Sequence, residues 1–150
     1  MLVDSWSRGL DFLAYGIAEF SFVLLLGNVF GVYWIRDTLD TNGNPIKSTT
    51  DEGYPFNYHD WQVTVQAFLC ISVILMFASF MLERLIGVEK GGYTLKSTIA
   101  GFWFCSMICT VVGMSFYTGY VKGVSYGMSY RFGWSSACLN LVASCLYAFV

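Results

Sequence analysis

Four long apolar segments constrain this chain more than any other feature of its sequence. They run over about residues 12–35, 61–82, 97–120 and 132–150. A helix needs about 20 apolar residues to cross roughly 30 Å of hydrocarbon, and all four segments meet this length. Barrel strands are about ten residues long, so these segments indicate helices. The sequence therefore predicts an all-α membrane protein, a four-transmembrane-helix bundle that forms one domain over residues 1–150.

The composition agrees with this class. Hydrophobic residues make up 56% of the chain and charged residues 12%, whereas soluble domains contain about 25% charged residues. The net charge is -2, and no basic stripe is present that would neutralise the phosphates of a nucleic acid. The first apolar segment is too long for a signal peptide and no small-residue cleavage site follows it. We expect a permanent integral membrane protein that does not bind nucleic acid.

The segments between the spans suggest an orientation. Basic residues divide equally, four to each side, so their count alone does not set the topology. The 36–60 loop also carries five acidic residues, which favours the outside for this loop and the cytoplasm for both termini. We expect the plasma membrane. Within the loop, Asn42-Gly43 suits a tight turn between two short strands and predicts a small extracellular β-hairpin. Gly91-Gly92 predicts a turn between the second and third spans.

Small residues recur at every fourth position of the third span. They let the backbone of another helix approach closely, which is how helices associate in lipid. The first span has two further glycines at the same spacing. Cysteines of the third span have no histidine or acidic companion at ligand spacing, so no metal site is predicted. We expect helix packing or partner contact at Gly27, Gly31, Gly101, Cys105, Cys109 and Gly113.

Glu19 lies inside the first apolar segment. A charged, unpaired carboxylate in hydrocarbon costs several kcal/mol, so such a residue is a functional candidate. It could be hydrogen-bonded inside the bundle, towards Gln62, Gln66 or Asn140. It could instead contact a partner protein, or handle ions or protons. A single acid without a second ionisable group makes a poor proton relay, so the first two interpretations are favoured.

Nothing in the sequence indicates catalysis. Asp40, Asn42 and Asn44 match the first three ligand positions of a calcium loop, but Pro45 stands where that loop requires glycine. His59 is the only histidine, and no serine or cysteine nucleophile has a base beside it in sequence. We therefore predict a protein that is not an enzyme, with no catalytic residues, metal, cofactor or small-molecule substrate.

The connection between the third and fourth spans is rich in glycine and tyrosine. Glycine permits close packing and sharp turns. A tyrosine ring suits the headgroup layer, because its body is apolar and its tip is polar. The sequence predicts an interfacial corner between the two helices rather than a solvated linker, with Tyr117, Tyr120, Tyr130 and Trp134 in it.

The second half of the chain resembles the claudin superfamily, which includes claudins, relatives of peripheral myelin protein and the γ subunits of calcium channels. In that family an aromatic S-[WF]-Y-like stretch closes the third helix, and a Y-x-[FY]-G-W-like stretch begins the fourth. The resemblance covers about residues 61–150, whereas the first loop is short and lacks the W…GLW…C…C pattern. The matching residues here are Ser115, Phe116, Tyr117, Tyr130, Phe132, Gly133 and Trp134.

These observations lead to one main expectation about function. We expect a non-catalytic tetraspan protein that serves as an auxiliary or scaffolding subunit of a larger membrane complex, with an ion channel or receptor as its partner. Contact with that integral membrane partner would be lateral, through helix faces surrounded by lipid. One alternative is a claudin-like adhesion or barrier protein of cell junctions. Another is an accessory subunit of an energy-converting membrane complex.

Overall fold

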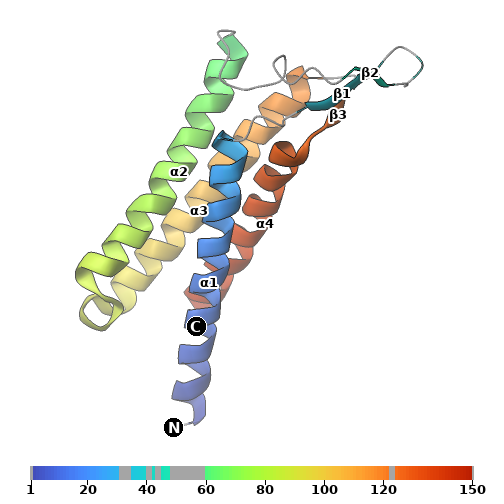
Figure 1. Cartoon of the computed structure of the whole chain (residues 1–150). Helices are drawn as coiled ribbons and strands as arrows, with labels where there is room; N and C mark the ends of the chain where they lie inside the picture. Colours follow the sequence, from blue (N-terminus) through green and yellow to red (C-terminus); the bar gives the residue numbers. More distant parts are fainter. Residues whose placement is uncertain are drawn as a thin grey trace.

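Four long helices form a bundle in the computed structural model, which describes residues 2–30, 35–39, 42, 45–47, 60–121 and 124–149. Each helix contains a segment long and apolar enough to cross a membrane. The predicted bundle of four membrane-spanning helices is confirmed, and the chain fits an integral membrane protein. The helices are α1 (Leu2–Phe30), α2 (Asp60–Ile86), α3 (Val88–Tyr120) and α4 (Met128–Phe149) (Figure 1).

The helices do not contact one another equally. Helix α3 packs extensively on α2 and on α4, and α4 packs extensively on α1. Helices α1 and α2 contact each other through far fewer residues, which leaves one side of the bundle loosely closed. Both chain termini and the turn between α2 and α3 lie at the same end of the bundle (Figure 1), called the termini end below.

The first helix has different bounds from those predicted. It begins at Leu2 rather than near residue 12, and it ends at Phe30 rather than near residue 35. The predicted end was wrong because apolar residues continue through Ile35, whereas the backbone of Ile35 already pairs with Tyr126 in a sheet. Hydropathy records that a segment is apolar, and it does not record where the backbone changes its hydrogen-bonding partner.

The turn between α2 and α3 also differs from the expectation. The helical conformation is interrupted first at Gly87, which was not predicted, and again at Gly92, within the predicted Gly91-Gly92 turn. The charged residues around these glycines are mostly helical. Gly87 has a φ of 73°, and Gly92 has a φ of 56° and kinks α3 near its start. Glycine adopts these left-handed backbone conformations without the strain that a Cβ atom would cause.

A short antiparallel sheet lies at the end of the bundle opposite the termini. Strand β1 (Ile35–Leu39) pairs with β2 (Pro45–Lys47) on one side and with β3 (Val124–Tyr126) on the other. The sheet therefore joins the first loop to the connection between α3 and α4. The predicted turn at Asn42-Gly43 falls largely outside the described residues, so the β-hairpin stays a prediction.

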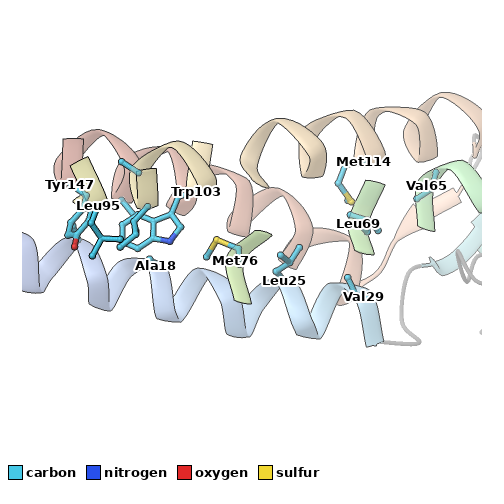
Figure 2. Packing of buried hydrophobic residues seen from close by; sticks show 14 of the residues in the cluster. Ala18, Leu25, Val29, Val65, Leu69, Met76, Leu95, Trp103, Met114 and Tyr147 are labelled. Atoms are coloured by element: carbon cyan, nitrogen blue, oxygen red, sulfur yellow. The ribbon is translucent and has the colours of Figure 1, made fainter. Parts of the chain in front are cut away.

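The hydrophobic core runs along the whole bundle (Figure 2). Trp103, Leu95 and Tyr147 fill the termini end, and Met114, Leu69 and Val65 lie towards the sheet. The outward faces of the helices are apolar as well, with large side chains that are more than half exposed, as lipid-facing helices require. Examples are Phe20, Val23, Ile74 and Phe77.

Candidate functional site

A chain of hydrogen bonds crosses the middle of the bundle and joins all four helices. The Ser21 hydroxyl of α1 donates to Asn140 Oδ1 of α4 over 2.7 Å, and Asn140 Nδ2 donates to Ser106 Oγ of α3 over 3.4 Å. The hydroxyls of Ser106 and Ser72 lie 2.7 Å apart, and Thr110 lies 2.6 Å from Ser72. These side chains are fully buried. The chain satisfies polar groups in an apolar interior and fixes the register of the helices.

Glu19 does not belong to this chain, so the expectation that it faces Asn140 or another amide inside the bundle was wrong. Its side chain is exposed. Ser21 lies two residues further along α1, and a rotation of about 100° per residue places the two side chains on opposite faces of the helix. Since Ser21 faces α4, Glu19 faces outward. The serines that form the interior chain were not predicted from the sequence. The only indication of them in the sequence is that a few hydroxyl residues lie within apolar segments.

Glu19 lines a groove between α1 and α2, the loosely closed side of the bundle. The groove has a volume of about 370 Å³. Its walls are mainly apolar and aromatic, and two of its lining side chains are acidic or basic, Glu19 and Arg84. No described residue forms a hydrogen bond or an ion pair with Glu19. The lining residues are Tyr15, Glu19, Phe22, Val23, Phe77, Phe80, Met81 and Arg84.

The small residues of α3 do not form one packing face. Gly113 is buried, and a Cβ atom there would lie 3.2 Å from Phe68 Cβ of α2. Gly101 is exposed, with nothing within 4 Å of such a Cβ atom, and Cys105 is exposed as well. Cys109 is partly buried. A four-residue repeat drifts around a 3.6-residue helix, so the row begins outside the bundle and ends inside it. The prediction that Gly101 and Cys105 pack within the bundle is therefore wrong. Both residues remain candidates for contact with a partner.

Only one of the two glycines that were predicted to pack in the first span lies among the described residues. Gly27 faces α4, where a Cβ atom would lie 3.0 Å from the Phe132 ring. Gly31 lies outside the described residues. A tighter contact, which was not predicted, occurs at Gly133 of α4, beside Asn28 of α1 and Met114 of α3. Asn28 donates from Nδ2 to the Ser129 carbonyl over 2.8 Å.

Three tyrosines gather where α3, the sheet and α4 meet. The rings of Tyr126 and Tyr130 stack with centroids 4.0 Å apart, and Tyr117 lies against both. The Tyr130 hydroxyl lies 2.6 Å from that of Thr118, and the Tyr126 hydroxyl donates to the Val121 carbonyl. Burial, and then the neighbouring Tyr130, raise the pKa of Tyr126, so this hydroxyl stays protonated and remains a donor at physiological pH.

The other two residues expected at this corner lie apart from the stacked rings. Tyr120 is 61% exposed at the end of α3. Trp134 is partly buried nearly two turns into α4 and packs against the core. The corner thus combines a tyrosine cluster, in which Tyr117 is buried and Tyr126 and Tyr130 are partly buried, with the exposed ring of Tyr120.

Among the described residues, no group of three or more histidine, cysteine or acidic side chains is placed to hold a metal ion. All five cysteines are free thiols. No protein-family model matches the sequence, and no curated protein matches it significantly.

Proposed function

We propose that this protein is a non-catalytic subunit of a larger membrane complex, with an ion channel or receptor as its partner. The observation that carries the proposal is the position of Glu19 in the groove between α1 and α2. A bundle that used this carboxyl only for its own stability would turn it inward, where Asn140 and the buried serines lie. Here the carboxyl faces outward from a membrane-spanning helix.

The energetics favour an occupant of the groove. A carboxylate exposed to hydrocarbon costs several kcal/mol, and the cost falls when another protein supplies a hydrogen-bond donor. Helices associate in lipid through close packing and interhelical hydrogen bonds. The groove offers both, because aromatic walls surround Glu19 and Arg84. A transmembrane helix of the partner, with a polar side chain at the level of Glu19, fits this chemistry.

Substitution of Glu19 tests the proposal. Glu19→Leu should reduce co-purification of membrane partners in mild detergent about tenfold, which corresponds to about 1.4 kcal/mol. Glu19→Gln keeps the hydrogen-bonding capacity and should reduce it less. The isolated Glu19→Leu bundle should be as stable as the unaltered bundle or more stable, because an exposed carboxyl has been removed from an apolar surface.

The matched control for this experiment is Phe20→Leu, which changes an exposed residue of α1 that does not line the groove. It should leave co-purification unchanged. Unchanged co-purification in both Glu19 variants would refute the proposed contact, and so would an unaltered protein that purifies without any membrane partner.

We also propose that both termini are cytoplasmic and that the sheet, including a hairpin of β1 and β2, is extracellular. Single cysteines at Asn42 and Tyr93 test this orientation, since both native side chains are exposed and they belong to opposite ends of the bundle. An impermeant thiol reagent should label only Asn42→Cys on intact cells and both variants after permeabilisation. Labelling of only Tyr93→Cys on intact cells would show that the protein has the opposite orientation.

A further inference from the structure

A second pocket lies at the termini end of the bundle, separate from the interior hydrogen-bond chain. It has a volume of about 390 Å³, much larger than the roughly 30 Å³ that one water occupies in the liquid. Tyr147 lies two residues before the end of α4, and Glu83 three residues before the end of α2. The pocket therefore lies within about one helical turn of the ends of α2 and α4. Its lining residues are Arg8, Asp11, Phe12, Tyr15, Glu83 and Tyr147.

Two buried polar atoms of this pocket lack partners. The Tyr147 side chain is only 2% exposed, and its hydroxyl forms no hydrogen bond with any described residue. Oε2 of Glu83 is buried without a hydrogen bond from the described part of the chain, although the Tyr15 hydroxyl lies close to the same carboxyl group. Buried polar atoms in native proteins are nearly always paired, so these two atoms favour a bound polar group. The Glu83 oxygen accepts a hydrogen bond, and the Tyr147 hydroxyl can accept one as well as donate one.

The charges around the pocket define what kind of ligand fits. Asp11 is neutralised by Lys96, whose Nζ lies 2.5 Å from Asp11 Oδ1 and 5.1 Å from the centre of the Tyr147 ring. Glu83 has no such ion pair among the described residues, so its free oxygen favours a cationic donor. Arg8 is exposed, and this guanidinium favours an anionic group at the mouth. Phe12, beside it, is 84% exposed and provides an apolar surface.

We propose that this pocket binds the headgroup of a zwitterionic lipid that ends in a primary ammonium group. The ammonium donates to Glu83 Oε2 and to the Tyr147 hydroxyl oxygen. The phosphate lies against Arg8 at the mouth, and the acyl chains run along the exposed apolar surface that begins at Phe12. A quaternary ammonium group has no N–H donor and leaves both buried atoms unpaired, so the pocket discriminates between two lipids of equal charge.

Lipid retention tests this proposal directly. The full-length protein is reconstituted with equimolar phosphatidylethanolamine and phosphatidylcholine of identical acyl chains, and native mass spectrometry measures which lipid stays bound. The unaltered protein should retain phosphatidylethanolamine about tenfold over phosphatidylcholine, because charge-assisted hydrogen bonds are lost with the latter.

Two conservative variants locate the site. Tyr147→Phe removes only the hydroxyl and keeps the ring, and Glu83→Gln removes only the charge. Each should reduce the preference severalfold, whereas Tyr93→Phe, an exposed tyrosine at the same end of the bundle, should keep it.

Equal retention of the two lipids by the unaltered protein would overturn the proposal, since it would show water or adventitious lipid in the pocket. A preference that persists in both variants would also overturn it. Because the comparison of lipids uses the unaltered chain, the test holds even if a variant fails to fold. It is independent of the partner contact at Glu19.

Discussion

Replacing Gly133 by alanine is expected to lower the free energy of unfolding by about 1–3 kcal/mol, the typical cost of overpacking. A Cβ atom at this position would lie 2.6 Å from Asn28 Nδ2 and 2.7 Å from Met114 Sδ, both inside van der Waals contact. Relief of the clash requires Asn28 to move, which breaks its hydrogen bond to the Ser129 carbonyl. Unfolding in mixed micelles with increasing denaturing detergent measures the effect.

Gly119→Ala is the control for this substitution. Gly119 also lies in a helix, but a Cβ atom there meets nothing within 4 Å. The control should be neutral or slightly stabilising, since alanine has a higher helix propensity than glycine. If Gly133→Ala is as stable as Gly119→Ala, then α1, α3 and α4 do not approach one another at this level as the structure shows.

Asn140→Ala should destabilise the bundle by about 1–3 kcal/mol, because it removes hydrogen bonds and leaves a small cavity. Asn140 is the only link between Ser21 of α1 and Ser106 of α3 in the described hydrogen-bond chain. Ser21 keeps its contacts with Ser136, so α1 should stay attached to α4, whereas the contact between α3 and α4 should weaken.

The same unfolding experiment measures this effect, with Ser135→Ala as its control. Ser135 is an exposed neighbour on α4, and its loss should change stability by less than about 0.5 kcal/mol. Equal stability of Asn140→Ala and Ser135→Ala would mean that the interior chain does not hold the helices together.

The number and type of the helices could be predicted from the sequence, because a run of about 20 apolar residues has few other stable forms. The inward face of each helix could not. In a soluble helix the apolar stripe marks the core, but here outward residues such as Phe20 and Ile74 are as apolar as the core. Only an isolated polar residue distinguishes the faces, and Glu19 and Ser21, two positions apart, point to opposite sides.

The candidate sites could not be predicted, because each is formed by residues that are distant in sequence. Gly113 and Gly101 share a repeat, yet only the position of α2 decides that one is buried and the other exposed. The pocket at the termini end combines residues of α1, α2 and α4, and no local sequence pattern predicts that Glu83 and Tyr147 line the same pocket. The sequence alone predicts that Ile35 ends an apolar helix, and only its pairing with Tyr126 shows that it belongs to a strand.

The central claim is that a membrane protein, rather than lipid alone, occupies the groove between α1 and α2. Photo-cross-linking in native membranes tests it most directly, with the reactive residue at Val23, which lines the groove and leaves Glu19 intact. The control position is Ile74, which is 64% exposed on α2 and does not line the groove. The account predicts a cross-link from position 23 to an integral membrane protein, and mainly lipid adducts from position 74. Lipid adducts alone at both positions would contradict it.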